Sequence, residues 1–403
     1  MPISHPIIAD GAVVVLGGKI QSVGRWQTIR REYPGAAVQD LGEAIILPGL
    51  INAHCHLEYT HLAGKFAPTR HFTAWLKEII AAKSATTRAG FNAAWRQGAA
   101  QLIRTGTTTV ADIISQATLP SSPTALRVFA FLEMTGIKSR QSPGYLVAAT
   151  ARKIKALHAR SQLAGFSPHA PYSTTTSLLE HTARVARRQR WRVTTHVAES
   201  AEEFDMFAAH RGPMFDWLGS LRNETDWGNC SPVEHLHRAG LLRANFLAAH
   251  ANHLTDHDLA LLRRSGASVV HCPRSHEFFS HEKFPFAKLI AAGINVCLGT
   301  DSLATIRKQR GQLPTLDLFA EMRAFARRHP RVSPAILLRL VTVNGAHALG
   351  LTGKIGALSP GAFADVIAIP CREKLADVPE AVLHHRGDIS ASLINGTWTI
   401  APH

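Results

Sequence analysis

Short apolar segments rich in β-branched residues alternate with helical segments along most of this chain. Strands that alternate with helices predict a parallel sheet, and eight such units suit a closed (β/α)₈ barrel. For 403 residues, length alone allows two or three domains, and one barrel with an accessory part fits equally well. The expected strands are 44–54, 107–114, 126–134, 163–170, 192–199, 245–251, 268–273 and 294–302.

The two ends of the chain have a different pattern. Residues 7–46 and 353–403 carry alternating apolar residues and glycine turns, including an Asn-Gly pair, which predict antiparallel hairpins. Two β-rich ends that flank a barrel can pair into one small β-sandwich. We therefore expect a discontinuous sandwich from 1–46 plus 353–403, and a catalytic barrel over 47–352.

Composition favours a globular protein without a membrane segment. Hydrophobic residues make up 46% of the chain and charged residues 18%, and no apolar run reaches the ~18 residues that span a bilayer. The N-terminal stretch lacks the cationic start and cleavage site of a signal peptide, so we expect a cytoplasmic protein. The five cysteines form no CxxC pair, which argues against a disulfide framework or a structural zinc ribbon.

The formal net charge of +15 raises nucleic-acid binding as a hypothesis. The lysines and arginines are dispersed in short helical faces, and no common nucleic-acid-binding motif is present. We therefore predict a basic, solvated surface and no nucleic-acid partner, with a basic nucleic-acid-binding protein as a distant alternative. The sequence leaves the oligomeric state open.

Ionisable side chains stand at the ends of five expected strands. Catalytic residues of parallel barrels lie at the C-terminal ends of strands, where side chains converge on one mouth. We therefore expect these residues to meet in one site. They are His54 and His56 on the first strand, His169 on the fourth, His196 and Glu199 on the fifth, His250 on the sixth and Asp301 on the eighth.

The pair His54 and His56 admits three interpretations: two structural histidines, a zinc-binding cluster with Cys55, or the first ligands of a catalytic metal. Alternate residues of a strand share a face, so both imidazoles point to one side and Cys55 to the other. Together with His196 and Asp301, three nitrogens and one oxygen can surround a metal and leave room for water. That is the ligand set of a catalytic zinc or iron site.

The remaining groups suit proton transfer. A metal-bound water whose pKa is lowered towards ~7 is a nucleophile at neutral pH. Asp301, at the metal, and His250, across the mouth, are candidates to take its proton. Glu199 is close enough to His196 to carry a proton to a leaving group. The alternative for Glu199 is a solvated carboxylate at the start of a helix.

These motifs together resemble the amidohydrolase superfamily, in its purine and nucleoside deaminase and chlorohydrolase branch. The resemblance covers essentially the whole chain and implies a metal-dependent barrel with a small sandwich built from both ends. It also implies metal ligation by His54, His56, His196 and Asp301, and proton transfer by Glu199 and His250. The matching segments are "LPGLINAHCHLE", "SPHAPYS", "HVAES", "AAHANHL", "HCPRS" and "LGTDS", with terminal segments such as "DGAVVVLGGKI".

The same resemblance makes His169 a substrate-contacting residue. Binuclear members typically have a carboxylated lysine at this place, so we expect one divalent metal ion, zinc, with iron or manganese as alternatives. Many members of the branch have asparagine where His276 stands. Arg274 and His276 therefore mark either a specialised part of the substrate pocket or a capped loop with solvated charges.

The expected substrate is a small, purine-like molecule, and the expected reaction is the hydrolytic release of ammonia. The stretches "HFTAWLKEII" and "FLEMTGI" are similar to those of aminodeoxyfutalosine deaminases, which would make Trp75 a stacking surface and Glu133 a hydrogen-bonding group. Packing in the core of an amphipathic helix is the alternative for Trp75. Cyclic amide hydrolysis and halide displacement on the same site remain open. The HxE and PCxxC pattern of nucleic-acid deaminases and the HExxH pattern of metalloproteases are absent.

Overall fold

The structure is a computed structural model that describes residues 1–115, 124–222, 229–309 and 311–402. Eight parallel strands follow one another in chain order, and a parallel bridge between Cys55 and Asp301 connects the last strand's end to the first strand. The predicted barrel is therefore confirmed. Its strands are β4 (Leu50–Cys55), β5 (Thr107–Ile114), β6 (Arg127–Met134), β7 (Leu163–Pro168), β8 (Val193–Val197), β9 (Phe246–His250), β10 (Ser268–His271) and β11 (Val296–Leu298).

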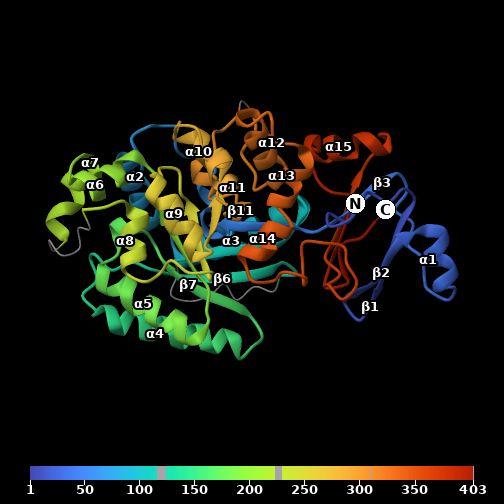
Figure 1. Cartoon of the computed structure of the whole chain (residues 1–403), viewed down its shortest axis with the longest axis horizontal. Coiled ribbons are helices and arrows are strands. Elements are labelled where there is room, and N and C mark those ends of the chain that lie inside the picture. The colour runs from blue at the N-terminus through green and yellow to red at the C-terminus, as the bar shows by residue number, and fades with distance from the viewer. Residues whose placement is uncertain (116–123, 223–228, 310, 403) are drawn as a thin grey trace.

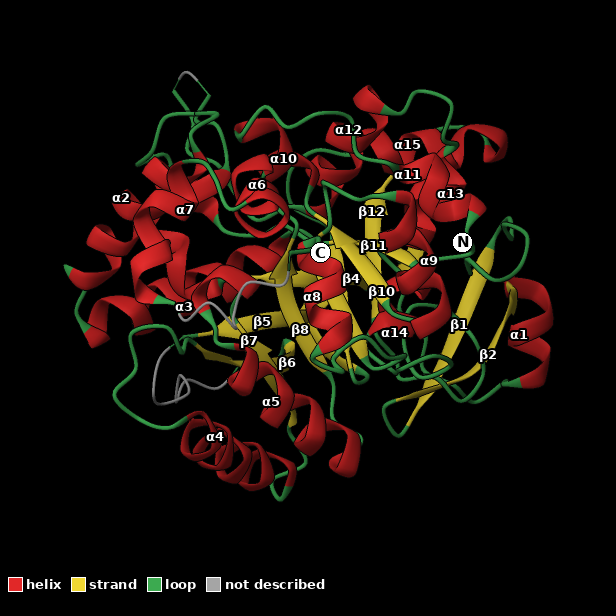
Figure 2. Ribbon diagram, turned by 60° about the vertical axis from the view of Figure 1, so that its left-hand side comes forward, coloured by secondary structure: helices red, strands yellow, loops and turns green. Residues whose placement is uncertain are grey.

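Helices surround the strands (Figure 2). Each turns an apolar stripe inward: α5 buries Leu178, Leu179 and Ala186, while Arg187 and Arg188 lie in its last turn. The basic residues of this segment therefore flank a packed helix and form no separate basic block. The helices between and after the strands are α2 (Phe72–Ser84), α3 (Arg88–Arg104), α4 (Pro143–His158), α5 (Thr176–Gln189), α6 (Ala201–Ala209), α7 (Pro213–Leu218), α8 (Pro232–Arg238), α9 (Asp256–Ser265), α10 (Pro273–Phe278), α11 (Phe286–Ala291), α12 (Leu318–Arg328), α13 (Pro334–Leu340) and α14 (Val343–Ala348).

The segment 44–54, which we expected to form one strand, is divided into two. β3 (Ala44–Pro48) pairs with a strand near the C-terminus, and β4 begins the barrel. Gly49 lies at the joint, where a Cβ atom would come 2.1 Å from Thr108 Oγ1. The apolar pattern continues across the joint because both strands are buried, so periodicity does not show where one sheet ends and the other begins.

Strands from both ends of the chain lie to one side of the barrel (Figure 1). A four-stranded antiparallel sheet has the order β14-β13-β12-β3, and a separate hairpin of β1 and β2 packs against it through residues such as Ile20 and Val366. The expected sheet domain from both termini is present, with both predicted hairpins. The elements are β1 (Gly11–Leu16), β2 (Lys19–Arg25), α1 (Trp26–Glu32), β12 (Val366–Pro370), α15 (Val378–His384), β13 (Ala391–Ile394) and β14 (Thr397–Ile400).

The exact division at residues 46 and 353 stays a prediction, and β3 continues to Pro48 across the first of these positions. An ion pair connects the barrel to the terminal sheet: Arg127, at the start of β6, bonds both carboxylate oxygens of Asp365. The side chains are 11% and 2% exposed. In the part of the chain that the structure describes, no helix is both long and apolar enough to cross a membrane.

Candidate metal centre and active site

The two histidines at the end of β4 lie at the mouth of the barrel and are 1% and 5% exposed. Cys55, between them, packs on the opposite side among Trp95 and Val110, as the alternation predicts. The carbonyl of His54 accepts N–H groups from Thr300 and Asp301 at 3.1 Å. The chain approaches His54 this closely because residue 299 is glycine, where a Cβ atom would lie 2.6 Å from that carbonyl oxygen. These contacts bring the eighth strand's carboxylate to the first strand's histidines.

Side chains from three strands lie close together, and the ligand atoms of His54, His56 and His196 are within 4.8 Å of one another. The Nε2 atoms of His56 and His196 are 3.1 Å apart, and Asp301 Oδ1 lies 3.8 Å from His54 Nε2 and 3.6 Å from His56 Nε2. Ligands about 2.0–2.2 Å from a common tetrahedral ion are separated by roughly 3.3–3.6 Å. The arrangement therefore has the dimensions of a metal site. His54 and Asp301 also form such a group with His250.

The donor set fits a divalent cation. Both ring nitrogens of His54 and Nδ1 of His56 are buried and have no hydrogen-bond partner among the described residues. Burial lowers the pKa of both imidazoles well below the usual value and that of His196 to about 3. Neutral imidazoles present lone pairs, and buried lone pairs without a donor are costly unless a cation binds them. The residues thus suit a metal ion.

Outer contacts orient two of the candidate ligands. His196 Nδ1 lies 2.8 Å from the carbonyl of His169, to which its N–H donates, so that Nε2 faces the other histidines. The hydroxyls of Ser275 and Thr305 donate to Asp301 Oδ2 at 2.7 and 3.1 Å. Hydrogen bonds of this kind fix the tautomer and the rotamer of metal ligands. The main-chain carbonyl of His169 therefore supports the centre, in addition to any contact that its ring makes with a substrate.

Glu199 and His250 lie beside the candidate metal ligands. His250 Nε2 is 3.6 Å from Glu199 Oε1, and both side chains are buried. Burial, followed by the charges of Asp301 and Glu203, raises the pKa of the Glu199 carboxyl well above its usual range. A carboxyl group that stays protonated near neutral pH can act as a general acid. The alternative of a solvated carboxylate is wrong, because Glu199 is 5% exposed.

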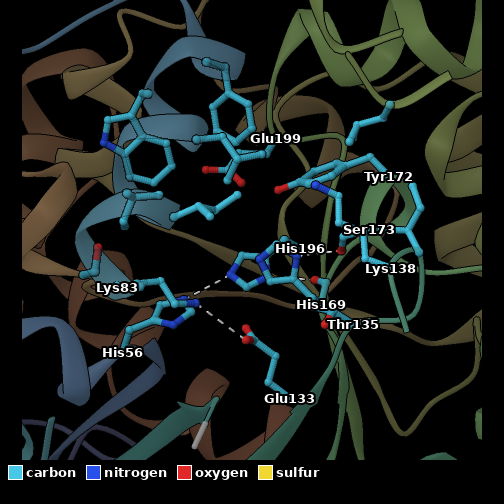
Figure 3. A pocket seen from close by; sticks show the side chains of 18 of the residues that line it. His56, Lys83, Glu133, Thr135, Lys138, His169, Tyr172, Ser173, His196 and Glu199 are labelled. Atoms are coloured by element: carbon cyan, nitrogen blue, oxygen red, sulfur yellow. Dashed lines mark hydrogen bonds and ion pairs between the residues drawn. The ribbon is translucent and has the colours of Figure 1, made fainter. Parts of the chain in front are cut away.

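A cavity of about 540 Å³ opens onto this site (Figure 3). His56, His196, Glu199 and Asp301 line one part of it, and most of the remaining lining is apolar or aromatic. Of the predicted substrate-binding residues, three line this cavity and two do not. His169, Glu133 and Trp75 are in the lining, whereas Arg274 and His276 are not.

The positions of Trp75 and Glu133 define what the cavity offers a ligand. Trp75 packs edge-on against Phe279, with ring centroids 5.0 Å apart, so it serves the core and the cavity wall together. The indole Nε1 of Trp75 and Oε1 of Glu133 are buried without a hydrogen-bond partner among the described residues. Lys83 Nζ lies 4.0 Å from Glu133 Oε2. Trp75 and Glu133 therefore each contribute an unpartnered polar atom to the wall of a largely apolar space.

Arg274 and His276 are bound to the protein itself. Arg274 Nε lies 2.6 Å from Oε1 of the fully buried Glu321, and its backbone N–H donates to the other carboxylate oxygen at 2.9 Å. His276 is 2% exposed, and its ring nitrogens lie 3.1 Å from Asn252 Oδ1 and 2.6 Å from the carbonyl of Glu282. Both residues stay predictions as substrate contacts, and their surroundings indicate a structural role.

Several cavity residues were not predicted from the sequence. Lys83 was missed although it continues, four residues on, the stripe of Trp75 and Ile79 along α2. A cation at the end of an apolar stripe is a usable signal, because that face of the helix is turned inward. Tyr172 and Trp217 also line the cavity, and no pattern in their segments distinguishes them from core aromatics.

A barrel with histidine and aspartate ligands at its strand ends, a buried glutamic acid and an adjoining cavity defines a candidate metal-dependent hydrolase. The chain belongs to the amidohydrolase family, whose model matches residues 45–398. It is accordingly a hydrolase that acts on carbon–nitrogen bonds other than peptide bonds.

Relatives and solved structures extend this similarity over nearly the whole chain. The 5-methylthioadenosine/S-adenosylhomocysteine deaminase of Syntrophobacter fumaroxidans is 30% identical over 93% of this chain and 87% of its own. Helicobacter pylori aminofutalosine deaminase, in complex with methylthio-coformycin, is 22% identical with a TM-score of 0.85, covering 99% and 97% of the two chains. A zinc-bound adenosine deaminase from Xanthomonas campestris is 24% identical, with a TM-score of 0.80 and coverage of 99% and 91%. These two structures support the fold.

Proposed function

We propose that this protein deaminates an adenosine-type nucleoside by hydrolysis and releases ammonia. The observation that carries the proposal is the convergence of His54, His56, His196 and Asp301 beside the buried acid Glu199 at one end of a nucleoside-sized cavity. The deaminase relatives support the same chemistry. Aminodeoxyfutalosine, methylthioadenosine and S-adenosylhomocysteine are the proposed candidate substrates.

A divalent ion, for which we propose zinc, would be held by His54, His56, His196 and Asp301, and would supply a water of lowered pKa as the nucleophile. Around it, the chain's own groups move protons. His250 and Asp301 belong to one group of potential ligands with His54, and either side chain would be placed to accept a proton from that water. Glu199, whose carboxyl pKa is raised by burial, is placed to donate its proton to the purine ring nitrogen. The proton taken from the water would pass to the departing amino group, which leaves as ammonia, and Glu199 would recover a proton from the oxygen that becomes the carbonyl of the product.

The apolar lining supports a purine substrate. The rings of Phe72, Trp75 and Tyr172 line the cavity and offer aromatic surface to a planar base. Glu133 Oε1, which has no partner among the described residues, can accept a hydrogen bond from a ligand hydroxyl. His169 has its Nδ1 atom 2.7 Å from Ser173 Oγ, which orients the ring beside His196.

A screen for ammonia release tests the proposal. Purified protein, loaded with zinc, would be incubated with methylthioadenosine, S-adenosylhomocysteine, aminodeoxyfutalosine, adenosine, adenine and guanine. We expect release from at least one adenosine derivative, with Glu199→Gln inactive as the control. Release from none of the aminopurines would overturn the proposal and favour cyclic amide hydrolysis or halide displacement. Halide displacement is the activity named for atrazine chlorohydrolase of Arthrobacter aurescens, which has a similar structure. That protein is 20% identical, with a TM-score of 0.81, and the match covers 96% of this chain and 90% of its own.

A further inference from the structure

Both main-chain polar groups of Glu199 are held by side chains from elsewhere. Its N–H donates to Oε2 of Glu203 at 2.8 Å, and its carbonyl accepts from Nδ2 of Asn252 at 2.9 Å. Main-chain groups at the end of a barrel strand usually bond to neighbouring backbone or to water. Two dedicated side chains on one residue therefore suggest that the exact position of Glu199 matters.

The backbone around Glu199 is in conformations that need such support. Ala198, just before it, has φ +50°, and His250 and Ala251, at the end of β9, have φ +71° and +47°. Left-handed conformations are unfavourable for residues with a Cβ and persist only where surrounding contacts fix them. The carbonyl of Ala198 accepts N–H groups from Asn252 and His253 at 2.9 and 3.1 Å. The ends of β8 and β9 thus form one bonded unit.

Glu203 is a buried carboxyl group that the proposed reaction does not use. It is 0% exposed, does not line the cavity and is the third residue of α6, whose N-cap Ser200 accepts its N–H at 3.1 Å. In a capping box, the third residue's carboxyl reaches the N–H of the N-cap. Here it reaches one residue further back, to Glu199. Burial of a carboxyl is costly, and hydrogen bonds from the backbone of Glu199 and Ala198 offset part of that cost.

His276 lies behind Asn252. Its Nδ1 atom is 3.1 Å from Asn252 Oδ1, and its Nε2 atom is 2.6 Å from the carbonyl of Glu282. Burial lowers the pKa of His276 to about 4, so the neutral ring has one N–H, which can donate to only one of these two oxygens. The histidine predicted as a substrate contact therefore lies next to the side chain that holds the carbonyl of Glu199.

We infer that Glu203 and Asn252 are positioning residues that fix Glu199 for proton transfer. The inference rests on the proposed function of Glu199 as the proton donor. Both residues hold the backbone of Glu199, so their loss displaces its carboxyl without removing it. A displacement of about 1 Å at a reacting group can lower a rate by ~10²-fold.

Matched alanine variants test the Asn252 contact. Asn252→Ala removes the bond to Glu199, and Asn245→Ala removes an equivalent bond, from Nδ2 to the carbonyl of Trp191, at the opposite end of β9. We expect Asn252→Ala to lower kcat by ~10–100-fold, with KM and bound zinc unchanged. Asn245→Ala should lower Tm without changing kcat. Equal losses of kcat in both variants, or none in Asn252→Ala, would overturn the inference.

A second pair of variants tests Glu203 independently of Asn252. Glu203→Gln keeps an oxygen that accepts the N–H of Glu199 and should retain most of kcat, whereas Glu203→Met, of similar length, should lose ~10-fold or more. Equal kcat in the two variants would contradict the role. A wild type that releases no ammonia, or Glu199→Gln with full turnover, would instead show that the proposed function itself is wrong.

Discussion

The two carboxylate oxygens of Asp301 make different contacts. Oδ2 accepts hydroxyls from Ser275 and Thr305, and Oδ1 faces the histidines of β4. Burial raises the pKa of this carboxyl, and the two hydroxyl bonds oppose that shift. A cation bound by this carboxyl would stabilise its ionised form, which burial alone disfavours.

Removal of a proposed ligand should remove the metal. We expect the metal content to fall from about one divalent ion per chain to less than a tenth of that in His54→Ala and in Asp301→Ala. Loss of an outer-shell partner alone lowers metal affinity by ~10–100-fold, and loss of a ligand should lower it further. Metal analysis of purified protein measures this. His237→Ala, at an exposed histidine of α8, is the control and should keep its metal. Full metal content in His54→Ala would refute the assignment.

Glu199→Gln should keep the metal and lower kcat by ~10²–10⁴-fold, the usual contribution of a general acid or base. The glutamine has the shape of the acid but no proton to transfer. Steady-state ammonia release measures the effect, and Glu180→Gln, on the exposed side of α5, provides the comparison. Turnover within twofold of wild type would remove Glu199 from the mechanism.

The pH dependence follows from the raised pKa of Glu199. An acid of raised pKa stays protonated below that value and loses its proton as the pH increases through it. The rate should therefore be maintained at neutral pH and decline on the alkaline side. Measurement of kcat between about pH 6 and 10 tests this. An alkaline decline of the same size in the residual activity of Glu199→Gln would assign it to another group.

At the scale of residues, the convergence of side chains was predictable where each follows directly from its place on a strand. His54, His56, His196 and Asp301 converge because strand ends of a barrel share one mouth. Arg274 could not be placed in the same way, because its partner, Glu321, lies on another helix. The support of Glu199 by Asn252 likewise joins segments far apart in the chain.

At the scale of elements, the strands were predictable and the joint between β3 and β4 was not. Each barrel strand is short, apolar and bounded by turn residues, so its position follows from the pattern. The change of sheet at Gly49 depends on Thr108, which lies beside it on β5. Only the packed structure reveals that close approach.

Gly49→Ala should destabilise the protein by ~1–3 kcal/mol, because the new Cβ would overlap the Thr108 side chain, and overpacking in a core has this cost. Urea unfolding measures the loss. Gly35→Ala is the matched control: a Cβ there meets no atom within 4 Å, and we expect a change of at most about 0.5 kcal/mol. Similar stability of the two variants would show that the joint tolerates a side chain.

At the scale of the whole molecule, one buried ion pair connects the barrel to the terminal sheet. Asp365 also accepts the N–H of Asn395, at 2.9 Å, in the turn between β13 and β14. Arg127 in turn bonds the side chain of Asn395 and lies over the ring of Phe363, 4.8 Å from its centroid. The ion pair of Arg127 and Asp365 therefore connects the barrel to the turn between β13 and β14.

Arg127→Met should lower the free energy of unfolding by ~3–5 kcal/mol, because it leaves the carboxylate of Asp365 buried and unpaired. Arg211→Met breaks an exposed pair with Asp205, whose side chains are 72% and 43% exposed, and should cost at most about 1 kcal/mol. Denaturant unfolding of both variants gives the comparison. A loss of less than about 1 kcal/mol in Arg127→Met would show that water or another group replaces the arginine.

The pairing of β3 with β12 also has a consequence for the order of events during synthesis. β3 leaves the ribosome before the barrel begins, yet its partner follows about 320 residues later. At ~5–20 residues per second, β3 waits roughly 15–60 s with unpaired backbone groups beside an apolar surface. During this interval the unpaired edge of β3 can pair with other chains, so slow translation would favour aggregation there.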